Sequence, residues 1–144
     1  MKSLKSVLIV LTFVLSLASC SDKQVLPAQL PVEIQTFVKQ NFPEQVISYA
    51  VKDWELFGSK YELTLNDGTM IDFDSDNVWD KISCQMKPVP AALVPPMIAA
   101  YANNSFPGIQ IVKIDKERYG YDVELANNLE LKFNKQGALM EVDD

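Results

Sequence analysis

Four aspartates lie close together near the middle of the chain, and their spacing is the first pattern that suggests chemistry. The stretch 72–80 reads D-x-D-x-D-N-x-x-D, which is similar to the start of a calcium-binding loop. Asn77, however, stands where such a loop needs glycine, and Ser83 stands where it needs a bidentate glutamate. The stretch therefore favours a hairpin turn with solvated acids, and a calcium site is the alternative. The aspartates concerned are Asp72, Asp74, Asp76 and Asp80.

Two further pairs of acids, Asp53 with Glu55 and Asp115 with Glu117, have the spacing that places two carboxylates on one face of a strand. Paired carboxylates can hydrolyse glycosides. No glycine-rich loop or nucleophile elbow accompanies these pairs, so solvated strand ends are the favoured interpretation. The sequence also contains no histidine, which excludes Ser–His and Cys–His catalysis and the usual zinc sites. We predict that the protein is not an enzyme and has no catalytic residue, metal or cofactor.

The first cysteine, Cys20, follows two lysines, an apolar core and small residues, which are the parts of a secretory signal. The apolar core is shorter than the roughly 20 residues that a spanning helix needs. Residues 17–20 read L-A-S-C and resemble the bacterial lipobox, whose cysteine carries the lipid. We predict a signal peptide at 1–19, lipidation of Cys20 and a lipidated tether at 20–27. Ordinary signal cleavage near Ala18 or Ser19, leaving a thiol, is the alternative.

The second cysteine, Cys84, has no partner for an intramolecular disulfide if Cys20 is acylated. A free cysteine most often behaves as a small buried hydrophobe. We expect this of Cys84, and a reactive or intermolecular thiol is the alternative.

The charge of the chain restricts its partners. The formal charge is −6, and it becomes −8 once the first 19 residues, which carry two lysines and no acid, are removed. Phosphate backbones and anionic membrane surfaces attract basic clusters. We therefore expect no nucleic-acid binding, and contact with the membrane through the lipid anchor only.

Two segments of the chain resemble each other. Residues 30–43 align with residues 94–107, and residues 61–66 align with residues 121–126. Each copy begins with apolar residues at helical spacing, between a proline that suits a first helical turn and a Phe-Pro pair that ends the helix. Four short strands are expected after each helix, and in the first copy they cover about 46–54, 60–66, 69–74 and 78–83.

The expected strands alternate between apolar and polar residues, which indicates an antiparallel sheet that is packed on one side. In the first copy Tyr61, Leu63 and Leu65 oppose Lys60 and Glu62. We therefore predict an α+β fold of two tandem repeats, at about 28–84 and 89–144. Each repeat would be one helix followed by a four-stranded antiparallel sheet. The helices would pack on one sheet face, and the other face would be open and charged.

This order of elements behind a lipobox resembles the PepSY-like, β-lactamase-inhibitor-like family of secreted Bacteroidetes lipoproteins. The resemblance covers nearly all of 26–144. It is carried by Phe42-Pro43 and Phe106-Pro107, by the Tyr-x-hydrophobic-x-Leu strands, and by residues 72–79. The last stretch looks like the family's F-D-x-x-G-x-W hairpin, with Asn77 in place of glycine. The resemblance implies a PepSY-like domain at 28–144, an extracytoplasmic location and a protein-binding role, and it supplies no catalytic residues.

We predict an extracytoplasmic, lipid-anchored binding module in the cell envelope, facing the periplasm or on the outer-membrane surface. It would bind a protein or peptide, as an inhibitor or regulator does, through the open face of the sheet. Inhibition of a β-lactamase would be a special case. A calcium- or small-ligand-binding lipoprotein that uses the acidic turn at 72–80 is the alternative. The predicted partner-binding residues are Trp54, Lys60, Glu62, Met70, Asp72, Asp122, Glu124, Glu130 and Lys132.

Overall fold

The computed structural model describes residues 22–144, so the predicted signal peptide and the lipidation of Cys20 lie outside the described residues. Within that range no helix is long and apolar enough to cross a membrane. The helices are α1 (Val32–Asn41) and α2 (Pro96–Ser105), each preceded by a short 3-10 helix, η1 (Pro27–Gln29) and η2 (Ala91–Leu93). The strands are β1 (Lys23–Gln24), β2 (Ile47–Glu55), β3 (Gly58–Leu65), β4 (Met70–Phe73), β5 (Trp79–Ser83), β6 (Ile111–Glu117), β7 (Gly120–Leu125), β8 (Glu130–Asn134) and β9 (Leu139–Asp143).

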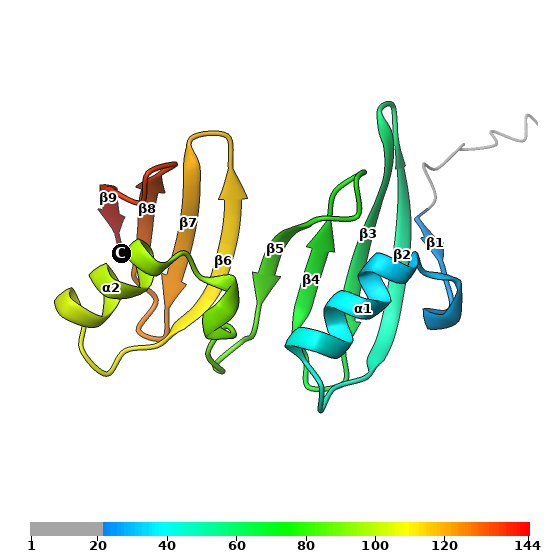
Figure 1. Cartoon of the computed structure of the whole chain (residues 1–144), viewed down its shortest axis with the longest axis horizontal. Coiled ribbons are helices and arrows are strands. Elements are labelled where there is room, and N and C mark those ends of the chain that lie inside the picture. The colour runs from blue at the N-terminus through cyan, green and yellow to red at the C-terminus, as the bar shows by residue number, and fades with distance from the viewer. Residues whose placement is uncertain (1–21) are drawn as a thin grey trace, which may run out of the picture.

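The nine strands of residues 22–144 form one antiparallel sheet, in which neighbours follow the order of the chain (Figure 1). The predicted α+β fold of two tandem repeats, each with its own four-stranded sheet, is therefore wrong: residues 22–144 are mostly β, with one sheet and two α-helices. The two predicted sheets are joined because β5 pairs with β6, with Ile82 opposite Ile114. Unpaired edges would leave backbone N–H and C=O groups without partners. Residues 23–24, predicted as tether, form β1 on the edge of β2.

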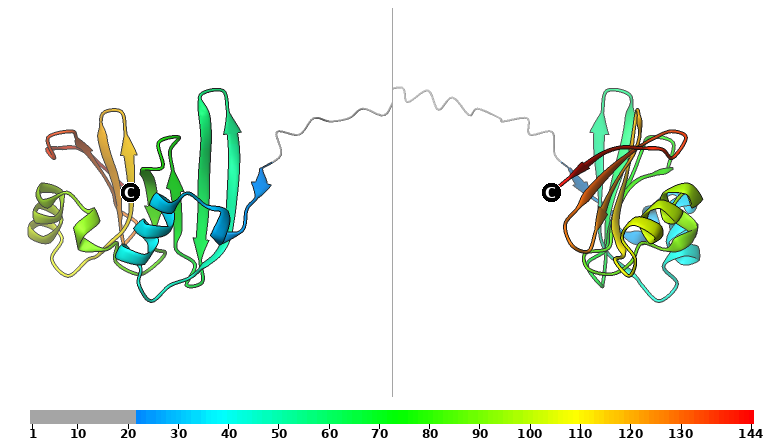
Figure 2. Two further views of the ribbon diagram at one scale, coloured as in Figure 1. Left: turned by 45° about the vertical axis from the view of Figure 1, so that its right-hand side comes forward. Right: turned by 90° about the vertical axis from the view of Figure 1, so that its left-hand side faces the viewer.

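Both helices lie on the same side of the sheet and leave its other side uncovered (Figure 2). Each helix follows a proline, Pro31 or Pro95. At its end a phenylalanine N–H donates to a carbonyl of the last turn, Phe42 to Val38 in α1 and Phe106 to Ala102 in α2. Helical spacing brings one apolar stripe of each helix onto the sheet. The buried residues of these stripes are Ile34, Val38, Ile98 and Ala102.

A single cluster of buried apolar side chains runs under both helices. Two aromatic pairs anchor the helices to it. The rings of Phe37 and Phe73 meet edge to face with centroids 5.4 Å apart, and those of Tyr101 and Phe133 do so at 5.5 Å. Such pairs add to the apolar burial that fastens a helix to a sheet. The uncovered side of the sheet is therefore held rigid from behind by one continuous core.

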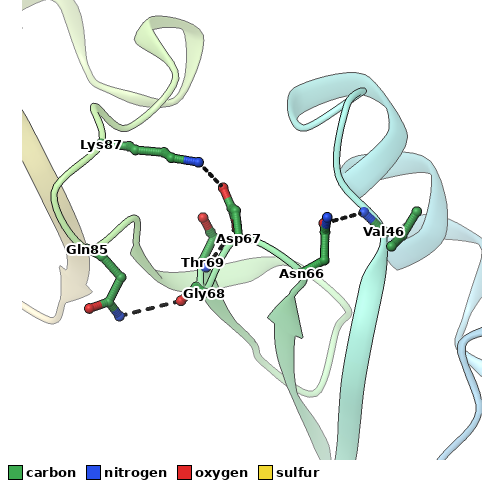
Figure 3. Close-up of polar contacts among 7 residues, drawn as sticks. All are labelled: Val46, Asn66, Asp67, Gly68, Thr69, Gln85 and Lys87. Carbon is green, nitrogen blue, oxygen red and sulfur yellow. Dashed lines mark hydrogen bonds and ion pairs between the residues drawn. The ribbon is translucent and has the colours of Figure 1, made fainter.

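The segment that follows β5 is tied to the turn between β3 and β4 (Figure 3). Asp67 accepts hydrogen bonds from the backbone N–H of Thr69 at 2.9 Å and from Nζ of Lys87 at 3.2 Å. The side chain of Gln85 donates to the carbonyl of Gly68 at 3.4 Å. These bonds hold the chain as it leaves β5, and so fix the point from which it crosses to α2 and returns as β6.

Cys84 lies beside this tie, with 3% of its surface exposed and no disulfide within residues 22–144. Its N–H donates to the carbonyl of Val112 at 2.8 Å, which continues the pairing of β5 with β6. The prediction of a buried cysteine is confirmed. Burial raises the pKa of the Cys84 thiol, and the hydrogen bond with Thr69 offsets this only in part. A raised pKa and a buried sulfur make the thiol a poor nucleophile.

Candidate functional site

The side of the sheet opposite the helices, which we call the open face, carries a row of side chains across the strands. Residues opposite each other in neighbouring strands share a face, so the register identifies the row directly. This central row, from β2 to β9, is Val51, Glu62, Asp72, Lys81, Asp115, Asp122, Lys132 and Glu141. A second row beside it, from β3 to β9, is Thr64, Met70, Ser83, Lys113, Glu124, Glu130 and Asp143.

Ion pairs and a hydrogen bond engage several of the charged side chains where the rows cross β7, β8 and β9. Nζ of Lys132 lies 3.1 Å from a carboxylate oxygen of Glu141 and 2.9 Å from one of Asp143. The hydroxyl of Tyr119 donates to Asp122 at 2.5 Å, and this bond raises the pKa of Tyr119 to about 12. The hydrogen bonds that Lys132 donates to Asp143 and Glu141 likewise raise the pKa of Lys132. Several acids at this end of the open face therefore have a partner, while Glu130 forms no ion pair within residues 22–144.

The other end, on β3 to β6, holds an excess of acid that we call the acidic patch, formed by Glu62, Asp72, Asp80 and Asp115. Lys81 is the cation placed among them, and its Nζ lies 3.5 Å from a carboxylate oxygen of Asp115. Glu62, Asp72 and Asp80 form no ion pair within residues 22–144. The patch thus has the charge pattern of a surface that attracts a cation or a basic segment.

Crowding raises the pKa of two of these acids. Burial, and next the carboxylate of Glu62, raise the pKa of Asp72, against the opposing influence of Lys81. Burial and the carboxylate of Asp115 raise the pKa of Asp80. A carboxyl whose pKa is raised is held in its charged form at a cost to the fold. These side chains are therefore not explained by stability.

The acidic turn itself has a structural explanation. Oδ1 of Asp74 accepts the backbone N–H groups of Asp76 at 2.9 Å and Val78 at 3.0 Å, and so closes the hairpin between β4 and β5. Asn77 takes the positive φ of 62° that the turn requires, in place of glycine. Among residues 22–144 no three acidic or cysteine side chains are grouped so that they could hold a metal ion.

The predicted site residues fall into two groups on the open face. Glu62, Met70 and Asp72 lie together on β3 and β4, while Asp122, Glu124, Glu130 and Lys132 lie together on β7 and β8. The strands between them carry side chains that the prediction missed, chiefly Lys81, Asp115 and Asp80. Alternation within 79–83 and 111–117 indicates that Lys81 and Asp115 each face away from the core. Only the pairing of β5 with β6 brings them next to each other in the central row. The binding role of all these residues stays a prediction.

Lys60 lies on the open face, two residues before Glu62 on β3. Trp54 lies near the end of the β2–β3 hairpin on the other side of the sheet, because it shares a face with Lys52, which is opposite the core residue Tyr61. Nζ of Lys52 lies 4.2 Å from the centroid of the Trp54 ring, and Nζ of Lys60 lies 3.3 Å from a carboxylate oxygen of Glu55. The other tryptophan, Trp79, packs against the core and is covered by Lys116, whose Nζ lies 3.7 Å from the ring centroid. Trp54 is therefore the tryptophan available at the surface.

Comparisons with known proteins agree with this fold. A family model described as "Putative beta-lactamase-inhibitor-like, PepSY-like" matches residues 59–141. No curated protein sequence gives a significant match to the chain.

Three crystal structures are similar over almost their full lengths. A "putative calcium-regulated periplasmic protein" from Bacteroides thetaiotaomicron is 29% identical, with a TM-score of 0.80, and the alignment covers 85% of this chain and 97% of that one. A "putative periplasmic protein of unknown function" from Bacteroides vulgatus is also 29% identical, with a TM-score of 0.81 and coverage of 86% and 100%. A "putative periplasmic protein" of the DUF2874 family from the same species is 30% identical, with a TM-score of 0.81 and coverage of 88% and 99%.

Proposed function

The chain belongs to the PepSY-like family, and from this premise we propose that it is an extracytoplasmic binding module. Its ligand would be a protein or peptide held on the open face of the sheet. The periplasmic description of the three similar structures supports the location. The lipobox-like sequence ending at Cys20 supports attachment to the envelope through a lipid on that cysteine.

The observation that carries the proposal is the acidic patch. It places Glu62, Asp72 and Asp80 on a rigid sheet without ion-pair partners from the described chain, although burial and mutual repulsion raise the pKa of Asp72 and of Asp80. Charges kept at a cost to the fold are characteristic of binding and catalytic surfaces. On β7–β9, by contrast, Lys132 pairs with Glu141 and Asp143, and Asp122 accepts a hydrogen bond from Tyr119. We therefore place the ligand on β3–β6 and expect a ligand segment rich in lysine or arginine.

The test is capture of envelope proteins on immobilised domain, compared among three forms. The first is the unchanged domain, and the second carries Glu62→Lys and Asp72→Lys. The third, a matched control, carries Glu33→Lys and Glu44→Lys, two exposed acids away from the open face. A partner retained by the first and third forms and lost by the second supports the proposal. Equal capture by all three forms, with all three folded, would contradict it.

A second candidate function, calcium binding, is favoured by the same unrelieved repulsion and by the calcium-regulated description of one similar structure. A divalent cation would neutralise Asp72 and Asp80 together. The measurement is calorimetric titration with calcium of the unchanged domain and of Asp72→Asn with Asp80→Asn. Calcium binding is supported if calcium releases or absorbs heat and raises the melting temperature in the unchanged domain but not in the variant. The absence of both effects in the unchanged domain would exclude it.

The lipid anchor has its own test, which does not depend on the ligand. Full-length protein expressed in a bacterium with a lipoprotein pathway should carry a mass increase on a peptide that begins at Cys20. Cys20→Ser should abolish the increase and release the protein from membranes. An unmodified Cys20 in the unchanged protein would contradict anchoring.

A further inference from the structure

The tip of the β2–β3 hairpin exposes three large apolar side chains. Leu56 is 96% exposed, Phe57 is 93% exposed and Trp54 is 64% exposed. Glu55 pairs with Gly58, so Leu56 and Phe57 form the two-residue loop itself. Hairpin loops of this length are normally built from Asn, Asp and Gly. Side chains that touch almost nothing in their own fold do not stabilise it, so Leu and Phe at these positions need another explanation.

The corresponding loop between β6 and β7 shows that the turn geometry does not demand apolar residues. There Glu117 pairs with Gly120, and the two loop residues are Arg118 and Tyr119. Both loops therefore contain two residues and are closed by a glycine, Gly58 or Gly120, at positive φ. The backbone requirement is met by the glycine, and the loop side chains are free to vary.

The tip projects away from the body of the sheet. It is the furthest point of the described chain at that end of the strands, beyond the turn between β4 and β5 (Figures 1 and 2). Its side chains are also graded along the hairpin. Leu56 and Phe57 stand at the apex, Trp54 lies two residues back, and Lys52 lies below Trp54 with its ammonium over the ring. An apolar apex, an indole and then a lysine is the order found across the boundary of a lipid bilayer.

The N-terminal strand brings the predicted anchor to the same level. Lys23 of β1 is opposite Lys52, and because the strands are antiparallel β1 begins at its end nearer the tip. Leu56 is four residues beyond Lys52, or about 13 Å along a strand. Cys20 is three residues before Lys23 and can lie at most about 10 Å from it. The reach of the chain therefore allows a lipid on Cys20 and the apex of the hairpin to meet one flat surface.

We propose that the β2–β3 tip, through Leu56, Phe57 and Trp54, inserts into the lipid bilayer as a second membrane contact. The occupant is lipid rather than protein because the tip is a convex point and not a groove. The expected lipid is uncharged overall. Lys23, Lys52 and Lys60 near the tip are opposed by Asp22, Asp53 and Glu55, and the turn at 74–77 adds further acid, so nothing here would draw an anionic surface. This inference replaces the expectation of contact through the anchor alone, and it requires neither a ligand on the open face nor a lipid on Cys20.

Residues 22–144 can be tested without the anchor. The three similar crystal structures are covered over 97–100% of their lengths by 85–88% of this chain, so a chain of this extent folds by itself. The probe is vesicles of phosphatidylcholine and phosphatidylethanolamine, with and without phosphatidylglycerol. Flotation measures binding. Trp79→Phe in every form leaves Trp54 as the single tryptophan, so that its emission and its quenching by brominated lipid report insertion.

The decisive variant is Leu56→Ser with Phe57→Ser, and the matched control is Met86→Ser with Met140→Ser, which removes two exposed apolar side chains elsewhere. We expect the parent to bind neutral vesicles with a blue shift and lipid quenching of Trp54. The affinity of the tip variant should be lower by a factor of roughly ten or more. The control should behave as the parent, and added phosphatidylglycerol should not strengthen binding. Absence of parental binding, as expected of a tip that docks on a protein, would overturn the proposal. So would equal binding by the tip variant.

Discussion

Asp74 and Asn134 perform the same structural task in two different hairpins. Oδ1 of each accepts hydrogen bonds from the backbone N–H groups two and four residues further along the chain, at distances of 2.9 to 3.0 Å. In each turn a residue at positive φ follows, Asn77 in the first and Gly137 in the second. A neutral amide thus closes the turn as well as a carboxylate does.

The first prediction follows from this equivalence. Asp74→Asn should leave the free energy of unfolding almost unchanged, because the amide oxygen can accept the same two bonds. Asp74→Ala should lower it by about 1–3 kcal/mol, since two backbone donors lose their acceptor. Urea denaturation followed by circular dichroism measures both. A large loss with Asn would show that the charge of Asp74 matters, against the turn-cap interpretation.

Asp72→Asn should stabilise the protein near neutral pH. Burial and Glu62 raise the pKa of Asp72 above its value in the unfolded chain. The stability associated with a raised carboxyl pKa is present below the unfolded pKa and is lost as the pH rises through the folded pKa. The gain of the variant should therefore appear near neutral pH and vanish below about pH 3. Urea midpoints at both pH values test this, with Glu44→Gln as control. A less stable variant near neutral pH would contradict it.

Asp67 should show the opposite dependence on pH. Burial alone would raise the pKa of Asp67, but the hydrogen bonds from Thr69 and Lys87 outweigh it and lower the pKa. Stability from a lowered carboxyl pKa is present above the unfolded value, about 3.9, and is lost as the pH falls through the folded pKa. Asp67→Ala should lower the free energy of unfolding by about 1–3 kcal/mol near neutral pH and by less in acid.

A double-mutant cycle separates the two partners of Asp67. Lys87→Met should account for about 1 kcal/mol or less, because the Lys87 side chain is 61% exposed and solvent weakens the pair. The larger part should remain with the backbone bond to Thr69. A coupling energy that equals the whole loss would assign the tie to the ion pair instead.

The joint between β5 and β6 should make unfolding cooperative. Ile82 and Ile114 are opposite each other and fully buried in the shared core. Ile82→Ala should lower the free energy of unfolding by about 2–5 kcal/mol. Because one core spans the sheet, circular dichroism and tryptophan fluorescence should report one transition in the variant as in the parent. Two separated transitions would show that the halves of the sheet unfold independently.

Cys84 should resist alkylation while the protein is folded. Its sulfur is buried, and burial raises the pKa of the thiol, so little thiolate is available. Iodoacetamide should modify Cys84 slowly in buffer and rapidly in denaturing urea, as measured by mass spectrometry. Rapid modification in buffer would indicate local opening around the segment after β5.

The sequence predicted the local elements better than their assembly. Alternation along 60–66 and 69–74 correctly predicted which side chains of β3 and β4 face the core, because a period of two is a property of each strand alone. The joint between Ile82 and Ile114 was missed, since pairing between distant strands leaves no local pattern. β1 was missed because two residues are too few to show a period.

The candidate site was predicted in part for the same reason. Glu62, Asp72 and Asp122 were correctly placed on the open face by alternation. Asp80 was not placed there. The register between β4 and β5 shifts between Asp72 and Phe73, and the extra residue of such a bulge interrupts the alternation of side chains along the strand. Leu56 and Phe57 were overlooked because a hairpin loop has no buried side from which their exposure could be judged.

The small size of β1 has a consequence for a molecule that is pulled at its N-terminal end. A protein held at its N-terminal end receives any pull first at Lys23 and Gln24, whose two pairs with β2 form the smallest contact between neighbouring strands in the described chain. Under tension this strand should detach before the wider sheet is loaded. Each residue freed from β1 lengthens the segment between the N-terminal end and β2 by up to about 3.5 Å. Detachment of β1 would then relieve the tension before the other eight strands of the described sheet begin to separate.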